Sequence, residues 1–328
     1  MDTSMQMKML MDMRRVRKME EVCAELYTKE KIRGFLHLYI GQEAVAAGVI
    51  NLLNAKDNVI ATYREHAHAL LKGISSRAIM AELFGRIDGC SKGRGGSMHL
   101  YSVENRFFGG GAIVASGVPQ SLGLAMASKR LKERRRTVCF FGEGAMAEGV
   151  FHESMNIASL WHLPVLFCCE NNLYAMGTSL MRSQSQTDLV KRAQVYVMEA
   201  NRVDGMNIFD VVEKTKQALE YIDRESKPFF LEFQTYRFRP HSMYDPEKYR
   251  GKAEVEKWKT RCPIEALEKK MKEQNILSDE QLRDMDRQID QELRDAVIFA
   301  DSSALEISSD LEKDVFAPMK DQAYETHL

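Results

Sequence analysis

The chain has 328 residues, a net charge of −1 and 45% hydrophobic residues. This length fits one large domain or two smaller ones, and the hydrophobic fraction is sufficient for a sizeable core. The near-neutral charge gives no general attraction to nucleic acid or to an anionic membrane, so we expect neither as a partner. No apolar run approaches the roughly 20 residues that span a bilayer.

The N-terminal residues are basic and rich in methionine, and they lack the apolar core and small-residue cleavage site of a signal peptide. We also expect no cleaved transit peptide. The six cysteines form no C-x-x-C motif and no zinc-ligand spacing, and Cys139, Cys168 and Cys169 lie in apolar runs. The cysteines are therefore expected to be buried free thiols, and the protein to be cytoplasmic.

Hydrophobic periodicity predicts the first elements of the chain. Residues 5–33 form a long helix of mixed charge, and residues 42–53 form a helix of small residues that could pack closely. Residues 59–62 form a short strand, which is followed by a polar turn and a helix. Residues 94–136 contain a glycine-rich loop and then a helix dense in glycine, alanine and serine.

The middle of the chain contains a strand–helix–strand pattern. Strands at 137–142 and 164–169 flank a helix at 147–162. This is the βαβ unit of a parallel sheet, and strands that are apolar throughout, like these two, are typical of a sheet buried on both faces.

The later part of the chain changes character. Residues 200–224 are expected to form a loop and an amphipathic helix, and residues 229–236 a third buried strand. Residues 252–298 are highly charged with helical periodicity, which predicts helices on the outside of the sheet domain or against a partner.

Polar residues follow both strands of the βαβ unit. Glu143 stands between Gly142 and Gly144, and Asn171 and Asn172 end the second strand. Neighbouring parallel strands bring their carboxyl ends together, where ligands bind, and carboxylate and amide oxygens suit Mg²⁺. A magnesium-diphosphate site is one interpretation. An ordinary turn and an ordinary loop are the other. A dinucleotide site is disfavoured because Ala-Met-Ala follows Gly144, so the third glycine is missing.

Several longer motifs carry a resemblance to a known family. They are "GFLHLYIGQEA", "YREH", "GRGGSMHLY", "FFGGGAIVASGVP", "GEG" followed 26 residues later by "NN", "VDGMN" and "YRFRPHSMYDPEKYR". In this order they resemble the α subunits of the thiamine diphosphate-dependent two-subunit 2-oxo acid dehydrogenases, over nearly the whole chain. "SMHLYSVENRFFGG" is closest in pattern to the pyruvate members.

The resemblance implies an α/β thiamine diphosphate-binding fold, with a mostly parallel sheet flanked by helices. We expect an N-terminal helical segment at 1–36, the thiamine diphosphate-binding domain at 37–250 and a helical C-terminal extension at 251–328. The implied metal ligands are Glu143, Asn172 and the backbone carbonyl of Tyr174. The family usually has Asp where Glu143 stands, and the extra methylene puts the metal geometry in doubt, although we expect binding to survive.

The resemblance also implies the residues that bind thiamine diphosphate. Besides Glu143, Asn172 and His241, they are Tyr63, Arg64, Ala112, Val114, Gly144 and Ala145. Arg64 would bind the diphosphate, for which a guanidinium is well suited, and its alternative is an ion pair with Glu65. The family usually has Gly where Ala112 stands, which is a second and milder departure.

His37 and His241 match the two active-site histidines of the family. Both would line the substrate pocket and stabilise the carboxylate and the developing alkoxide of the substrate. Pro240 replaces a family glycine and stiffens this loop. The residues near Ser242 break the pattern of the regulated relatives, so we do not expect control by a kinase. The remaining motif histidines are expected to order loops: His66, His68 and His99.

The implied activity is oxidative decarboxylation of pyruvate, followed by reductive acetylation of a lipoyl group. The glutamate that would activate the cofactor's aminopyrimidine is not evident in this chain, and the family takes it from a β subunit. We therefore expect an α2β2 heterotetramer, with the lipoyl acyltransferase as a further partner. The alternatives are an acetoin or branched-chain 2-oxo acid enzyme, a non-catalytic structural homologue, and a nicotinamide dehydrogenase that acts alone.

Overall fold

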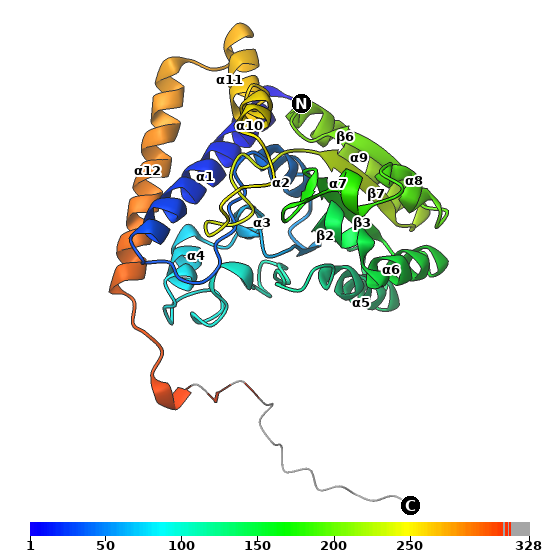
Figure 1. Ribbon diagram of the computed structural model, residues 1–328, viewed down its shortest axis with the longest axis horizontal. Coiled ribbons are helices and arrows are strands. Elements are labelled where there is room, and N and C mark those ends of the chain that lie inside the picture. The colour runs from blue at the N-terminus through cyan, green and yellow to red at the C-terminus, as the bar shows by residue number, and fades with distance from the viewer. Residues whose placement is uncertain (311, 314, 316–328) are drawn as a thin grey trace, which may run out of the picture.

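The computed structural model describes residues 1–310, 312, 313 and 315, so part of the predicted C-terminal extension lies outside the described residues. Its centre is a five-stranded sheet in the order β1-β2-β3-β7-β6 with helices on both faces (Figure 1). All four strand pairings are parallel. This confirms the predicted α/β class. None of the described helices combines the length and the apolar character needed to cross a bilayer.

The strands are short and the helices vary widely in length. The sheet consists of β1 (Asn58–Ile60), β2 (Thr137–Gly142), β3 (Val165–Asn171), β6 (Glu199–Asp204) and β7 (Phe229–Gln234), and a small hairpin consists of β4 (Tyr174–Ala175) and β5 (Thr178–Ser179). The helices are α1 (Thr3–Thr28), α2 (Glu43–Ile50), α3 (His66–Lys72), α4 (Ser76–Leu83), α5 (Gly117–Arg130), α6 (Gly149–Leu160), α7 (Leu180–Ser183), α8 (Leu189–Gln194), α9 (Ile208–Glu225), α10 (Lys252–Lys259), α11 (Pro263–Glu273) and α12 (Asp279–Ser302), with single turns η1 (Gly96–Met98), η2 (Glu143–Ala147) and η3 (Ser308–Asp310).

The sheet is buried on both faces, as its apolar strands predict. Along β2, Phe140 packs into one hydrophobic core and Phe141 into the other, because successive side chains of a strand point to opposite faces. The helices α2 and α9 cover the first face, and α5 and α6 cover the second. The chain passes from β2 to β3 through α6 and from β6 to β7 through α9, and these two steps run in opposite directions along the sheet. Because such crossovers are right-handed, the two helices lie on opposite faces.

Two sequence expectations were wrong in part. The segment expected to be a loop before α9 contains β6, an edge strand whose apolar residues are only Ala200 and Val203, so it lacks the continuous apolar run of a central strand. The first helix ends at Thr28 rather than at residue 33, because Glu30 takes a left-handed conformation with φ of 57°. The other predicted strands and helices are present, with ends shifted by a few residues.

The N-terminal helix α1 and the C-terminal helices α11 and α12 pack side by side on the sheet domain (Figure 1). Ion pairs join α1 to them, from Arg14 to Glu268 and Asp286 and from Arg15 to Glu292. Ile264, Leu267 and Met271 of α11, which share one apolar face in the sequence, are buried in the same core as α1. The domain boundaries near residues 36 and 250 stay a prediction.

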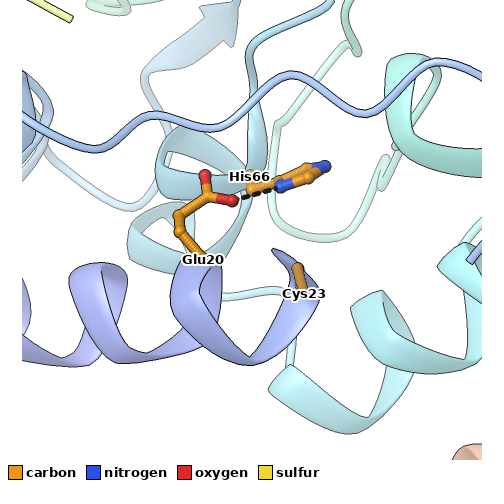
Figure 2. Close-up of side chains that lie close together, drawn as sticks. All are labelled: Glu20, Cys23 and His66. Carbon is orange, nitrogen blue, oxygen red and sulfur yellow. Dashed lines mark hydrogen bonds and ion pairs between the residues drawn. The ribbon is translucent and has the colours of Figure 1, made fainter. Parts of the chain in front are cut away.

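A buried polar cluster joins α1, through Glu20, to the segments that contain Tyr39 and His66 (Figure 2). Glu20 accepts hydrogen bonds from the backbone N–H of Tyr39 at 3.0 Å and pairs with His66 Nδ1 at 2.9 Å. The other ring nitrogen of His66 lies 2.8 Å from Ser97 Oγ. Cys23 completes a group of three potential metal ligands. Because both oxygens of Glu20 and both nitrogens of His66 already have partners, we assign the cluster a structural role, in line with the expectation for His66.

A second anchor from α1 is a buried ion pair. Arg17 Nε lies 2.6 Å from Glu43 Oε1, and Glu43 is fully buried at the start of α2. Both carboxylate oxygens of Glu43 also accept from the N–H of Gly41 at 3.0 Å. The turn that leads into α2 is therefore held by a charge on α1.

We expect Arg17→Leu to lower the free energy of unfolding by about 3 kcal/mol, because it leaves the Glu43 carboxylate buried without a countercharge. Urea unfolding measures this value. Lys18→Leu is the matched control: its partner Asp290 is 42% exposed, so the cost should stay below about 1 kcal/mol. Equal effects of the two substitutions would contradict this assignment.

Candidate active site

A cavity of about 650 Å³ opens at the carboxyl ends of four strands. Its walls come from residues 61–64 after β1, 142–145 after β2, 172–176 after β3, and from Arg237 and His241 after β7. This is the position at which open parallel sheets bind ligands. Every residue that the sequence assigned to the site lies in this wall: His37, Tyr63, Arg64, Ala112, Val114, Glu143, Gly144, Ala145, Asn172, Tyr174 and His241.

Glu143 is the central group of the cavity. The parallel register pairs Gly142 with Glu170, so that Glu143 follows β2 directly beside the end of β3. The N–H of Asn172 donates to Glu143 Oε2 at 3.3 Å. The other oxygen, Oε1, is buried and has no hydrogen-bond partner among the described residues. Burial raises the pKa of Glu143, so the site favours a cation beside this carboxylate.

The two amides that end β3 have different surroundings. Asn171 donates to Glu232 Oε1 at 2.8 Å and thus ties β3 to β7. Asn172 faces the cavity, and its Nδ2 donates to Gln42 Oε1 at 3.1 Å. Its Oδ1 lies 3.4 Å from the N–H of Tyr174. Only the second of the paired amides therefore offers its oxygen to the site.

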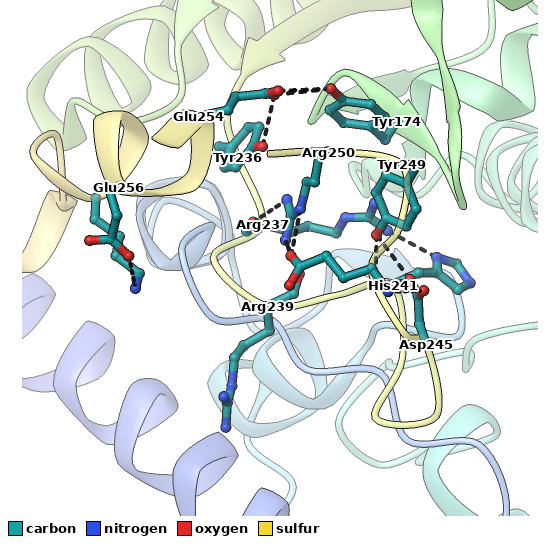
Figure 3. Close-up of polar contacts among 12 residues, drawn as sticks. Tyr174, Tyr236, Arg237, Arg239, His241, Asp245, Tyr249, Arg250, Glu254 and Glu256 are labelled. Carbon is teal, nitrogen blue, oxygen red and sulfur yellow. Dashed lines mark hydrogen bonds and ion pairs between the residues drawn. The ribbon is translucent and has the colours of Figure 1, made fainter. Parts of the chain in front are cut away.

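The side chain of Tyr174 is held by a hydrogen bond to α10 (Figure 3). Its hydroxyl donates to Glu254 of α10 at 3.0 Å, and the hydroxyl of Tyr236 donates to the same carboxylate at 2.8 Å. Burial raises the pKa of both phenols, and the acceptor Glu254 adds to the effect. Tyr174 can therefore serve the cavity through its backbone, as the sequence suggested.

His37, His241 and Tyr63 form a group of contacting rings. The ring centroids of the two histidines are 4.9 Å apart, and Tyr63 lies 4.6 Å from His37 and 5.6 Å from His241. Burial lowers the pKa of His37 to about 2 and of His241 to about 3, and the positive charge of Arg64 adds to both shifts. Both rings are therefore neutral at physiological pH.

The tautomer of His241 follows from its partner. Arg237 Nη1 lies 2.9 Å from His241 Nδ1. A guanidinium can only donate, so Nδ1 is the acceptor and the neutral ring carries its proton on Nε2. Arg237 is itself buried, and its second Nη donates to the carbonyl of Met176 at 3.1 Å.

Arg64 is buried beside the histidines. Its Nη1 donates to the carbonyl of Leu38 at 2.6 Å and its Nη2 to the carbonyl of His241 at 2.7 Å. Glu65, the alternative partner weighed from the sequence, instead accepts from the N–H of Leu100 at 2.7 Å. Burial raises the pKa of Glu65 well above its usual range, which favours the uncharged acid. Arg64 therefore brings an unneutralised positive charge to the cavity wall.

The segment that carries His241 is stabilised by hydrogen bonds between its own residues (Figure 3). Asp245 accepts from the N–H of His241 and from the hydroxyl of Tyr249, both at 2.9 Å. Arg250 donates to the carbonyls of Arg237 and Arg239 at 2.7 Å. These bonds fix the backbone of the loop on both sides of His241.

The rim of the cavity is apolar and exposed. Val114 is 46% exposed and its neighbour Ile113 is 75% exposed, while Phe35 and Met176 on the opposite segments are 57% and 60% exposed. Ala112 lies in the same loop as Val114. At the other end of the cavity the chain packs closely, because a Cβ on Gly144 would come within 2.6 Å of Ala175 Cβ.

Sequence reasoning missed several residues of the cavity wall, and three of them are polar groups close to the predicted site residues. These three are Gln42, Glu170 and Arg237. Glu170 is held by the Tyr39 hydroxyl and lies 3.4 Å from His68 Nε2. Each of the three stands inside a motif that the sequence displayed, at "GQEA", "CCENN" and "TYRFRP". A polar residue within these motifs was the available signal, but its direction depends on tertiary packing.

The depressed histidine pKa values predict a pH-dependent stability. Between pH 6.5 and about 3 the unfolded chain binds protons at His37 and His241 that the folded chain does not bind, so stability falls as pH falls. The loss is at most about 1.4 kcal/mol per pH unit for each ring. The difference between the urea midpoints at pH 7.5 and pH 5.0 should therefore be smaller in the double variant His37→Asn/His241→Asn than in the wild type. The exposed His152→Asn is the control, and an unchanged decline in the double variant would contradict the assignment.

The chain was compared with known proteins. Residues 11–307 match the family model "Dehydrogenase E1 component". The chain is 42% identical over 310 residues to the pyruvate dehydrogenase E1 component subunit alpha-3, chloroplastic, of Arabidopsis thaliana. The matched region covers 93% of this chain and 72% of the Arabidopsis chain. It is 41% identical over 309 residues to the pyruvate dehydrogenase E1 component subunit alpha of Rickettsia bellii, covering 94% and 95%. With the corresponding subunit of Porphyra purpurea it is 43% identical over 313 residues, covering 93% and 91%. The chain therefore belongs to the dehydrogenase E1 component family.

Proposed function

We propose that the chain is the α subunit of a pyruvate dehydrogenase E1 component. It decarboxylates pyruvate with thiamine diphosphate and transfers the acetyl unit reductively to a lipoyl group. The names of the relatives support pyruvate as the substrate. The observation that carries the proposal is the buried Glu143 carboxylate at the carboxyl ends of β2 and β3. Its Oε2 accepts from the N–H of Asn172, and its Oε1 has no partner among the described residues.

The donor set fits Mg²⁺. Glu143 Oε1, Asn172 Oδ1 and the carbonyl of Tyr174 would hold the ion, and all three are the hard oxygen ligands that it prefers. The unpartnered oxygen of Glu143 and its raised pKa both support a cation there. Glu143 starts η2, and its longer side chain reaches the N–H of Asn172 at 3.3 Å, which supports a glutamate in place of the family's aspartate.

The remaining wall fits thiamine diphosphate. Arg64 would neutralise diphosphate charge, and the backbone of Gly144 and Ala145 would approach the same oxygens. Ala112 and Val114 would contact the aminopyrimidine ring, with Tyr63 lining the opposite wall. Bound thiamine diphosphate would supply the carbon nucleophile and the electron sink for the decarboxylation.

The two histidines would act on the substrate as neutral groups. His241 holds its proton on Nε2, because Arg237 occupies Nδ1, and can donate it to an oxyanion. The buried Nδ1 of His37 has no partner among the described residues and is free to engage a substrate group. Burial keeps both rings neutral. Arg64 and Arg237 add to this effect and contribute positive potential where the carboxylate of pyruvate would bind.

The exposed apolar rim supports a partner subunit. Phe35, Ile113, Val114 and Met176 surround the mouth of the cavity, and large apolar side chains gathered at one mouth mark an interaction surface. A β subunit would cover this mouth, supply the carboxylate that activates the aminopyrimidine, and complete an α2β2 heterotetramer. The lipoyl acyltransferase of the complex would receive the acetyl group. The free cysteines among the described residues fit a reducing compartment such as the cytoplasm.

Co-expression with the β chain and a panel of 2-oxo acids tests the function. We expect decarboxylation coupled to lipoyl acetylation, with pyruvate giving the highest kcat/KM. A higher kcat/KM for a branched-chain 2-oxo acid or for acetoin would contradict pyruvate as the substrate and identify that compound instead. An assembled α2β2 that binds no thiamine diphosphate under any metal would instead indicate a non-catalytic homologue.

Substitution of Glu143 tests the metal site. We expect Glu143→Asp to retain activity and Glu143→Ala to lose magnesium-dependent binding of thiamine diphosphate, measured by calorimetry on the assembled protein. Because the pKa of Glu143 is raised, the wild type should need more Mg²⁺ as pH falls toward that pKa. Full thiamine diphosphate affinity in Glu143→Ala would refute this metal site.

A further inference from the structure

Gln42 lies in the cavity wall, next to Asn172. Its side chain is fully buried, and its Oε1 accepts from Asn172 Nδ2 at 3.1 Å. Building on the proposed function, we propose that Gln42 is a positioning residue, which lets Asn172 turn its oxygen rather than its nitrogen toward the metal.

An asparagine side chain needs such a partner to be a reliable metal ligand. Its oxygen can bind a cation but its NH₂ group cannot, and the terminal torsion is broad and roughly two-fold. When Oδ1 faces the metal, Nδ2 points away from it into the protein. Without Gln42, that buried donor would be unpaired in the orientation that binds the ion, and an unpaired buried donor is costly.

The second contact of Asn172 selects between the two orientations. Asn172 and Gln42 could exchange donor and acceptor by turning both amides together. The N–H of Tyr174, 3.4 Å from Asn172 Oδ1, favours the orientation in which that oxygen is on the cavity side. In the exchanged orientation, Nδ2 of Asn172 would face this N–H, and two donors would oppose each other. A cation beside Glu143 adds to the same preference.

The backbone at Gln42 is held more firmly than its position in a loop suggests. Gly41 has φ of 103°, and a Cβ at this position would lie 2.4 Å from the carbonyl oxygen of Tyr236. The N–H of Gly41 donates to both oxygens of Glu43, which is paired with Arg17. The N–H of Gln42 donates to the carbonyl of Tyr39 at 3.1 Å. The ion pair between α1 and α2 thus fixes the point from which Gln42 reaches Asn172.

The test measures the Mg²⁺ concentration that gives half-maximal binding of thiamine diphosphate to the assembled α2β2, by calorimetry. Gln42→Met removes the acceptor and should raise this concentration by about tenfold or more, the range known for residues that orient metal ligands. At saturating Mg²⁺ its kcat should recover. Gln42→Glu keeps an acceptor for Asn172 Nδ2 and should stay within about threefold of wild type. Val49→Ala, a buried change in the same helix, should lower Tm without moving the Mg²⁺ requirement.

A wild-type Mg²⁺ requirement in Gln42→Met would overturn the proposal, as would an equal loss in Gln42→Glu. Should Gln42→Met fail to fold, Asn172→Asp carries the test, because Gln42 can turn its amide to donate to Asp. The double variant Gln42→Glu/Asn172→Asp opposes two carboxylates, and its loss of magnesium-dependent binding should exceed the sum of the losses in the two single variants. Additive effects would overturn the proposal. Absence of magnesium-dependent binding in the wild type itself would instead refute the proposed function.

Discussion

The parallel register between β2 and β3 is the constraint on which the site depends. It places Glu143, which follows one strand, within hydrogen-bond distance of the backbone of Asn172, which follows the next. The carboxylate that results is buried and only half satisfied. Folding alone does not compensate such a group, because a buried charge without a partner raises its own pKa and costs stability. The proposed Mg²⁺ would supply the missing countercharge.

The rest of the cavity compensates charge around this centre. Arg64 and Arg237 are buried positive groups. Backbone carbonyl groups and a histidine nitrogen, rather than carboxylates, accept these hydrogen bonds. Burial keeps His37 and His241 neutral, and the charges of the two arginines add to this effect and make this part of the cavity wall positive. The proposed metal site at Glu143 and this positive wall would lie in one pocket, which would suit a cofactor with a metal-bound diphosphate and a substrate that carries a carboxylate.

The sequence predicted the parts of this arrangement that depend on local pattern. Apolar runs located β2, β3 and β7, and glycines and amides at the strand ends located Glu143 and Asn172, because strand ends meet whenever such strands pair. It failed where tertiary packing decides. The edge strand β6 has too few apolar residues to be recognised, and the directions of Gln42 and Arg237 depend on helix α2 and on the loop after β7.

The most direct test of the central claim is to locate the metal. A crystal structure of the assembled α2β2 with thiamine diphosphate and Mn²⁺ in place of Mg²⁺ would give an anomalous peak at the ion. The account predicts one peak in the cavity, at about 2.0 to 2.3 Å from a Glu143 carboxylate oxygen and from Asn172 Oδ1. A peak elsewhere, or an ion that contacts neither residue while thiamine diphosphate is bound, would contradict it.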